Sequence, residues 1–348
     1  MGLVYHSAVG GASAPTISVC IANYNGDALL PACLDAVLGQ RDAPQIEVIV
    51  HDDASDDGSV ELLRRRYPQV TLLESQENVG FCVANSRMVG VAQGEYVLLL
   101  NNDAELFPDA VTTLLGAARA ARDPEILTLP QYDMATGGLV DHGCLLDPFY
   151  NPVPNLDPGR ERVAYVIGAC LWIPRRMWRD LGGFPDWMVS LAEDMYLGCA
   201  ARLQGFEVRA LSGSGYRHAQ GASFGGNAVR DGVLKSTVRR RLLSERNKSA
   251  TLFLCTPTIL AWPWFVVHAF SLLVEGSVLA LMSRDARLWR EVYRPVLADL
   301  SRMPWRLAAR RRTLQARRRI SLPRYLQVFT PVPRKLVLLW RYGLPRVR

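Results

Sequence analysis

The sequence predicts an α/β fold in which an open, mostly parallel central sheet carries helices on both faces. Apolar, strand-like runs alternate with helix-like segments between residue 16 and about residue 130, and this alternation is typical of βαβ units. Polar residues follow three of the runs, at 23–25, 52–53 and 101–103. Because ligands of open α/β sheets bind at the carboxyl ends of the strands, these residues predict a binding site at that edge.

The elements of the first half follow one another at regular spacing. The turn signal Asn23-Tyr24-Asn25-Gly26 ends the first apolar run, and Asp27 is expected to cap the next helix. No GxGxxG follows the first strand, and neither GxxxxGKS nor GxxxxGKT occurs, so an NAD or P-loop site is not predicted. We expect strands over 16–22, 46–53, 70–75, 95–100 and 125–130, and helices over 27–40, from the turn at 55–59 to about 66, over 79–92 and from 108 to about 121.

The second half is less regular. Residues 137–162 are rich in Pro, Gly and Asp and are expected to form loops, whereas 163–173 is strand-like. Helices are expected over 193–203 and from about 229 to 254, with a Gly/Ser-rich loop at 212–227 between them. An apolar stretch at 258–282 and an Arg-rich tail complete the chain.

Composition limits the class of protein. Hydrophobic residues make up 49% of the 348 residues and charged residues 21%, which supports a sizeable core and excludes a disordered chain. The seven cysteines are scattered without a CxxC pair, so reduced cytosolic thiols fit better than a disulfide framework or a zinc ribbon. The first residues lack the basic and apolar regions typical of a secretory signal, and we therefore expect a cytoplasmic location.

The net charge of +7 conceals an uneven distribution along the chain. Residues 284–348 hold 18 basic and 3 acidic residues (+15), whereas residues 1–283 hold 22 basic and 30 acidic residues (−8). A basic tail of this kind indicates an interaction surface. Nucleic-acid binding is a second hypothesis for it, but the acidic clusters in the body argue against a nucleic-acid partner.

Six segments follow one another along the chain: ISVCIANYNG (17–26), HDDASDDGS (51–59), ENVGFCVANSR (77–87), YVLLLNNDAEL (96–106), GGFPDWMVSLAEDMYLGCAARLQGFEV (182–208) and HAQGAS (218–223). In this order they resemble family-2 inverting glycosyltransferases of the GT-A fold, and most of all their bacterial rhamnosyltransferase-like branch. The resemblance implies a Rossmann-like GT-A domain over 16–250. We expect a flexible N-terminus at 1–15 before it and, from the apolar stretch and the basic tail, a C-terminal helical, membrane-associating region at 251–348.

The resemblance further implies a nucleotide-sugar donor and a divalent cation. The family's DxD motif appears as Asn101-Asn102-Asp103, so Asp103 is expected to coordinate Mg²⁺ or Mn²⁺, with help from Glu105 and His218. Hard oxygen ligands suit these cations, which neutralise a diphosphate leaving group. The alternative for Asp103 is a cap on the next helix.

The donor site implied by the resemblance lies at the same strand ends. Asp52 is expected to accept hydrogen bonds from the base or the ribose, and the alternative is an Asx turn before Ser55. For Gly80 the alternative is a simple turn into a helix. The full set expected to line the donor site is Ala22, Tyr24, Asn25, Asp52, Asp53, Asn78, Gly80, Asn85, Asn101, Asn102 and Arg246.

An inverting transfer needs a general base that deprotonates the acceptor hydroxyl. By resemblance the base is Asp194, with Glu193 beside it; the alternative is a helix N-terminus that favours acids. The family's EDxD pattern has Tyr196 at its last position here, which affects the acceptor contacts rather than the base. The Gln-x-x-Arg-Trp signature of processive members is absent, so one sugar per encounter is expected.

The apolar stretch at 258–282 is long enough to cross a bilayer. Pro263, His268 and Glu275 make crossing costly, so an in-plane or re-entrant segment is favoured over a span or a buried or oligomer-facing helix. The Arg clusters at 310–312 and 317–319 suit anionic headgroups.

Together these features predict a metal-dependent, inverting, non-processive glycosyltransferase (a hexosyltransferase). It would move L-rhamnose from dTDP-L-rhamnose to a lipid-linked or polysaccharide acceptor in bacterial cell-surface glycan synthesis. It would be peripheral or monotopic on the cytoplasmic face of the cell membrane. The alternatives are a UDP-hexose donor, a nucleotidyltransferase, for which no Gly/Lys-rich loop follows the first strand, and a catalytically silent binding module. An oligomer is left open.

Overall fold

The chain folds as two compact units. The computed structural model describes residues 3–7, 14–219, 228–230, 233–257, 260–343 and 346–347, without the side chains of 228–235, 283 and 346–347. The first unit comprises residues 1–144, 154–190 and 206–219, and the second comprises 145–153, 191–205 and 220–348. The bounds of these units do not coincide with the domain boundary predicted at residue 250. That boundary stays a prediction.

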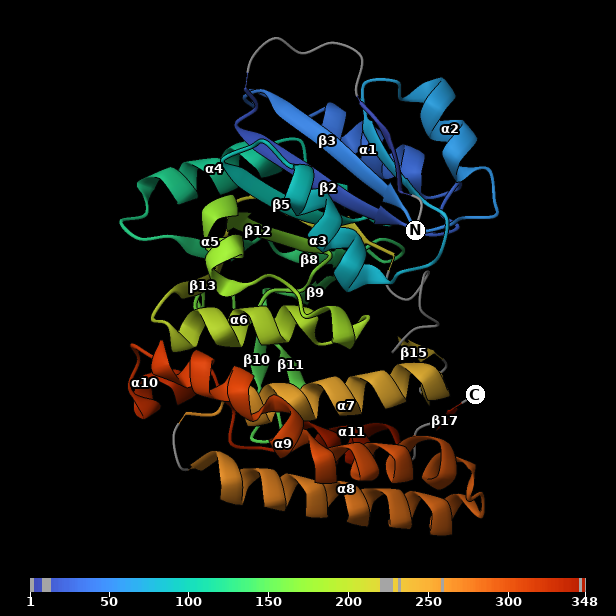
Figure 1. Ribbon diagram of the computed structural model, residues 1–348, viewed down its shortest axis with the longest axis vertical. Helices are drawn as coiled ribbons and strands as arrows, with labels where there is room; N and C mark the ends of the chain where they lie inside the picture. Colours follow the sequence, from blue (N-terminus) through green and yellow to red (C-terminus); the bar gives the residue numbers. More distant parts are fainter. Residues whose placement is uncertain are drawn as a thin grey trace. The chain divides into compact units, whose positions relative to one another are not determined.

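An eight-stranded mixed sheet forms the centre of the first unit, in the order β1-β4-β3-β2-β5-β12-β7-β13 (Figure 1). β4, β3, β2 and β5 run parallel, as do β7 and β13, whereas β1 and β12 run antiparallel to their neighbours. This sheet confirms the predicted α/β class. Its strands are β1 (Leu3–His6), β2 (Ile17–Asn23), β3 (Ile46–Asp52), β4 (Thr71–Ser75), β5 (Tyr96–Asn101), β7 (Glu125–Thr128), β12 (Cys170–Pro174) and β13 (Glu207–Ala210).

Helices cover both faces of this sheet. Ile17, Val19 and Ile21 of β2 share one buried cluster with residues of α1, α2 and α4. α3 packs against β2 and β3 without joining that cluster, so it covers the other face. The helices of this unit are α1 (Leu30–Leu38), α2 (Ser59–Arg66), α3 (Phe81–Val91), α4 (Ala110–Ala120), α5 (Arg175–Leu181) and the 3₁₀ turn η1 (Asp186–Met188).

A second, four-stranded sheet in the first unit was not predicted. Its order is β6-β14-β8-β9, built from β6 (Ala104–Leu106), β14 (Tyr216–His218), β8 (Gln131–Asp133) and β9 (Leu139–Asp141). Because β6 directly follows β5 and pairs with β14, this sheet carries His218 to the end of β5. A two-stranded sheet joins β10 (Cys144–Leu146) and β11 (Pro152–Pro154).

The second unit is mainly helical. Its long helix α7 packs against α6, α8, α9 and η3 (Figure 1). The helices are α6 (Glu193–Leu203), α7 (Val238–Cys255), α8 (Ala261–Ser283), the π-helical turn η3 (Trp289–Tyr293), α9 (Arg294–Ala316), α10 (Leu322–Leu326) and α11 (Arg334–Tyr342). A small sheet adds β15 (Ala228–Arg230), β16 (Val233–Ser236) and β17 (Arg346–Val347).

The structure corrects four expectations about local structure. Residues 3–6 of the N-terminus expected to be flexible form β1 and pair with β4. Asp27 does not cap α1, whose N-cap is Leu29 without a side-chain hydrogen bond. Only residues 170–173 of the strand-like run 163–173 lie in a strand, β12, because the chain turns where Cys170 N donates to Ile167 O (3.1 Å). The earlier part of the apolar run reflects burial instead. The helix expected from about 229 begins at Val238, after two short strands.

Candidate active site

Buried polar side chains connect the carboxyl ends of three neighbouring strands in the first unit. Asn23, at the end of β2, donates from Nδ2 to Asp52 Oδ2 at the end of β3 (2.9 Å). Asn102, just after β5, donates from Nδ2 to Asn23 Oδ1 (2.8 Å). Asn23 is 1% exposed; it belongs to the polar group predicted at 23–25, although the predicted donor-site residues do not include it. The predicted polar edge is therefore a connected network.

Asp52 is already engaged by its own turn. Its Oδ1 accepts from Ser55 N (2.9 Å), and its Oδ2 accepts from Ser55 Oγ (2.7 Å) as well as from Asn23. The Asx-turn alternative is thus present in the structure. The same Ser55 Oγ accepts from Asn25 N (2.9 Å), and Asn25 Oδ1 accepts from Asp56 N (2.9 Å). Asp52 and Asn25 together fix the loop after β3.

Asp53, Gly80 and Asn85 hold the start of α3. The carboxylate of Asp53 accepts from Val79 N (2.8 Å) and Gly80 N (2.9 Å). Gly80 has φ +84°, and a Cβ there would lie 2.9 Å from Val189 Cγ1, so no other residue fits without strain. Asn85 Nδ2 donates to Phe81 O within the helix (2.9 Å). These three residues have structural roles beside the strand ends.

The remaining candidates at this edge differ in exposure. Tyr24 is 50% exposed, and Asn78 is also exposed. Ala22 and Asn101 are half-buried and lie opposite each other on β2 and β5. The exposed side chains of Tyr24 and Asn78 are accessible to a ligand, whereas Ala22 and Asn101 are only partly accessible.

Asp103 and His218 meet at the end of β5. His218 Nε2 lies 2.9 Å from Asp103 Oδ1, and the side chains are 10% and 3% exposed. Even so, Asp103 Oδ1 accepts no well-formed hydrogen bond from any described residue. His218 Nε2 is also 3.3 Å from Asn101 Nδ2, and its Nδ1 is 3.3 Å from Gln131 Oε1. The His218 ring thus lies between Gln131 Oε1 on its Nδ1 side and Asp103 Oδ1 on its Nε2 side.

The Asp103 carboxylate oxygen and the His218 imidazole nitrogen lie 2.9 Å apart. A carboxylate suits Mg²⁺ and Mn²⁺, and an imidazole nitrogen is a common ligand of divalent metals. The structure therefore brings together two of the three predicted metal ligands. Gln131, which orients His218 and accepts from Tyr216 OH (2.9 Å), was missed because β8 was not predicted.

Glu105 is not brought to this pair. The register places Glu105 opposite Arg217, and Ala104 opposite His218. Because successive side chains of a strand point to opposite faces, Glu105 lies on the other face of β6 from His218. Among the described residues no group of three or more His, Cys, Asp or Glu side chains is arranged to hold a metal. The rest of the predicted HAQGAS segment, residues 220–223, lies outside the described residues.

The predicted base lies in the second unit, at the first turn of α6. α6 covers Glu193–Leu203, as the sequence predicted. Glu193 is 5% exposed and Asp194 is half-buried. Burial raises the pKa of Glu193, the charge of Asp194 raises it further, and Arg240 lowers it by less. Glu193 therefore tends to keep its proton while its neighbour is ionised, which separates the roles of the two carboxyl groups.

A strained turn positions this pair of acids. Leu191 has φ 73° and Ala192, the N-cap of α6, has φ 65°, a left-handed conformation that costs L-residues energy. The fully buried Asn247 donates from Nδ2 to Leu191 O (2.8 Å), and Arg246 Nε donates to Asn247 Oδ1 (3.0 Å). Asn247 thus holds the turn, and Arg246 lies beside it on α7, in the second unit; its predicted contact with the donor stays a prediction.

Comparisons with known proteins agree with the geometry. The family model for glycosyl transferase family 2 matches residues 18–181. Residues of this chain are 27% identical over 186 residues to the N-acetylglucosaminyl-diphospho-decaprenol L-rhamnosyltransferase of Mycobacterium tuberculosis, covering 44% of this chain and 60% of that protein. They are 32% identical over 190 residues to the chondroitin synthase of Escherichia coli, covering 53% of this chain and 26% of the relative. This chain thus spans less than two thirds of these relatives.

Solved structures share the fold. GalNAc-T7 with UDP, GalNAc and Mn²⁺ superimposes with a TM-score of 0.55 at 15% identity, over 69% of this chain and 48% of that one. TarS residues 1–349 from S. aureus, in complex with UDP-GlcNAc, gives a TM-score of 0.50 at 16% identity, over 86% and 90%. Residues 18–181 thus carry a glycosyl transferase family 2 domain, and its sequence is similar to that of the rhamnosyltransferase-like branch.

Proposed function

We propose that this chain is a metal-dependent, inverting glycosyltransferase that moves a sugar from a nucleotide donor to a lipid-linked or polysaccharide acceptor in bacterial cell-surface glycan synthesis. The observation that carries the proposal is the Asp103–His218 pair, a buried carboxylate oxygen and imidazole nitrogen 2.9 Å apart at the carboxyl end of β5. The family 2 domain at residues 18–181 supports the reaction type.

Asp103 and His218 would hold a divalent cation, Mg²⁺ or Mn²⁺. When bound, the cation would neutralise the charge that develops on the diphosphate leaving group. Gln131 Oε1 lies 3.3 Å from His218 Nδ1, and this contact would hold the ring with its Nε2 toward Asp103. The exposed residues Tyr24 and Asn78 are the proposed contacts of the nucleotide or sugar.

Asp194 is the proposed general base. The acceptor hydroxyl oxygen forms a bond to the anomeric carbon, the bond from that carbon to the diphosphate oxygen breaks, and the hydroxyl proton passes to the Asp194 carboxylate. Glu193 keeps its proton because burial raises its pKa, so it does not compete for the acceptor proton. The turn at 191–192 fixes where these carboxyl groups point.

The proposed donor is dTDP-L-rhamnose, supported by the similarity to the mycobacterial rhamnosyltransferase. The name of that relative includes a diphospho-decaprenol carrier, which supports a lipid-linked acceptor and a site on the cytoplasmic face of the membrane. The alternative is a UDP-hexose, since the solved relatives of the same fold were determined with UDP or UDP-GlcNAc.

The experiment measures nucleotide-sugar binding and transfer separately. Thermal shift with dTDP-rhamnose and a panel of UDP-hexoses, each with Mn²⁺ and with EDTA, should show stabilisation by one donor class only when the cation is present. Asp194→Asn should keep this shift and lose about 10²–10⁴-fold in transfer rate, the usual contribution of general-base catalysis. Normal transfer by Asp194→Asn would exclude this base, and cation-independent binding would exclude the metal.

A further inference from the structure

Helix α8 of the second unit has an apolar side that no described residue covers. The helix is 23 residues long and includes a segment, Ala261–Met282, that is long and apolar enough to cross a membrane, with a mean hydropathy of 1.9. Its exposed positions recur every three or four residues, so they form one face. With Ser277 as the polar member, this outward face consists of Trp262, Pro263, Val266, Val267, Phe270, Leu273, Val274, Ser277, Val278, Leu281 and Met282.

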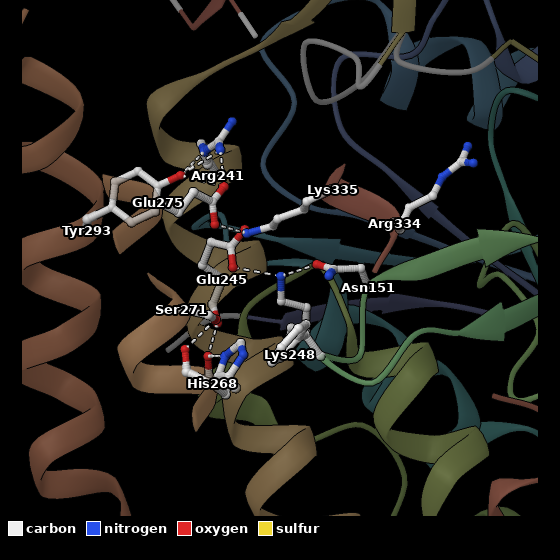
Figure 2. Close-up of polar contacts among 12 residues, drawn as sticks. Asn151, Arg241, Glu245, Lys248, His268, Ser271, Glu275, Tyr293, Arg334 and Lys335 are labelled. Atoms are coloured by element: carbon white, nitrogen blue, oxygen red, sulfur yellow. Dashed lines mark hydrogen bonds and ion pairs between the residues drawn. The ribbon is translucent and has the colours of Figure 1, made fainter. Parts of the chain in front are cut away.

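The two ionisable side chains of α8, His268 and Glu275, point into the unit instead. His268 is 1% exposed, and its Nε2 lies 2.8 Å from Ser249 Oγ on α7. Glu275 accepts from Arg241 (2.8 Å) and Tyr293 OH (2.9 Å), as Figure 2 shows. The usual arrangement of a surface helix, apolar side inward and polar side outward, is therefore partly inverted.

An ion-pair cluster accounts for this inversion. Lys335 of α11 contacts both Glu275 and Glu245 (2.6 Å each), and Lys248 pairs with Glu245 (2.7 Å) and donates to Asn151 Oδ1 (2.6 Å) (Figure 2). Glu275, one of the polar residues that make the sequence costly in a membrane, is thus neutralised by partners on other helices of the unit. The outward face exposes neither a charge nor an unpaired carboxylate.

The packing of α8 excludes a span across the bilayer. α8 lies against α7, η3 and α9, and its contacts run from Phe265, whose ring is 5.3 Å from that of Phe253, to Glu275. A spanning α8 would take α9 with it into the hydrocarbon. Charged side chains are very unfavourable there, and α9 exposes five arginines: Arg294, Arg302, Arg306, Arg310 and Arg312.

We propose that the outward face of α8 lies parallel to the plane of an anionic lipid bilayer and buries its apolar side chains at the hydrocarbon boundary. The 18 basic and 3 acidic residues of 284–348 supply the matching charge for anionic headgroups. Trp262, 52% exposed at the start of the helix, is a residue type that favours that boundary. This inference specifies how the chain would bind the proposed membrane. It rests on the proposed function only because a lipid-linked acceptor would explain why the enzyme binds a membrane.

Vesicle co-sedimentation tests the face with matched variants. The full chain should bind phosphatidylglycerol-containing vesicles at low salt, and high salt should reduce this binding without abolishing it, because the apolar part resists screening. Val266→Glu/Phe270→Glu, at positions 64% and 63% exposed, should lower the bound fraction at least tenfold. Leu156→Glu, 61% exposed in the first unit, should bind like the wild type. A wild-type chain that stays in the supernatant would overturn the proposal.

Spin labels distinguish the orientations. All seven native cysteines are buried, so single cysteines introduced at Val266, Phe270, Val274 or Val278 can be labelled selectively. An in-plane helix predicts similar depths for all four labels in vesicles. A progressive change of depth would mean a span, and labels immobilised without vesicles would mean that a second copy covers the face; either result overturns the proposal. Donor-dependent thermal shift reads the proposed function separately, because it needs no membrane.

Discussion

Asn247→Ala tests whether a buried amide on α7 positions the proposed catalytic carboxyl groups on α6. Asn247 is fully buried and donates to the carbonyl of Leu191 (2.8 Å). Leu191 and Ala192 both have positive φ, at 73° and 65°, and they directly precede Glu193 and Asp194. Removing the amide leaves the strained turn without this support.

The expected loss of the competent conformation follows from comparing two energies, the strain of the turn and the hydrogen bond that offsets it. Each left-handed non-glycine residue costs about 1–2 kcal/mol, so the turn stores about 2–4 kcal/mol. A buried carbonyl that loses its donor costs about 1–3 kcal/mol, which is comparable to the stored strain. Loss of the hydrogen bond should therefore let the turn relax and reduce the competent conformation by about 5- to 150-fold, since 1.4 kcal/mol corresponds to a factor of ten.

The assay compares kcat and donor KM. We expect kcat to fall by this factor of about 5 to 150 while donor KM changes little, because the proposed donor residues of the strand ends lie in the first unit. Asn155→Ala is the matched control: Asn155 is 3% exposed and donates to His142 O (2.9 Å) and Arg160 O (2.8 Å), so it should lose similar stability and keep kcat. A kcat of Asn247→Ala within threefold of the wild type, at a similar loss of Tm, would refute the positioning role.

Three further predictions concern the first unit. Asp103→Ala should abolish cation-dependent donor binding in thermal shift, and an equal shift with EDTA in the wild type would contradict the metal assignment. Gly80→Ala should lower the free energy of unfolding in urea by about 1–3 kcal/mol, because φ is +84° and the Cβ would lie 2.9 Å from Val189 Cγ1; Gly116→Ala, with nothing within 4 Å, is the control expected to be neutral or stabilising. Burial lowers the pKa of His51 from 6.5 to about 4, so the unfolded chain binds more protons between these values and stability should fall as pH drops through that window, by up to about 3 kcal/mol. His51→Gln should lack this pH-dependent loss, and an identical acid unfolding profile would contradict it.

Much of the architecture follows from local patterns. Alternating apolar and polar runs predicted the parallel strands β2, β3, β4 and β5 and the helices between them, because burial on both faces requires continuous apolar strands. The helix over 193–203 was predicted with its observed bounds. Thr237, which caps α7 by accepting from Arg240 N (3.2 Å), was a local signal that would have placed the start of α7 correctly.

Contacts between distant segments decided the site. The pairing of β6 with β14 places His218 beside Asp103 and turns Glu105 to the opposite face; a strand register depends on both partners, so one strand's sequence cannot supply it. Burial of Glu193 and support of its turn by Asn247 likewise depend on the packing of α6 against α7.

The apolar stretch at 258–282 also combines features that the sequence determined with a feature that only the tertiary structure decided. The sequence determined a long apolar helix, and the spacing of His268 and Glu275 by seven residues places them on one face. Which face turns inward was decided by tertiary structure, because the partners of Glu275 lie on α7, η3 and α11: Arg241, Tyr293 and Lys335. A charge can be buried only where the fold brings opposite charges to it. The partners of Glu275 are too far from it in the chain for a local sequence pattern to predict the contact.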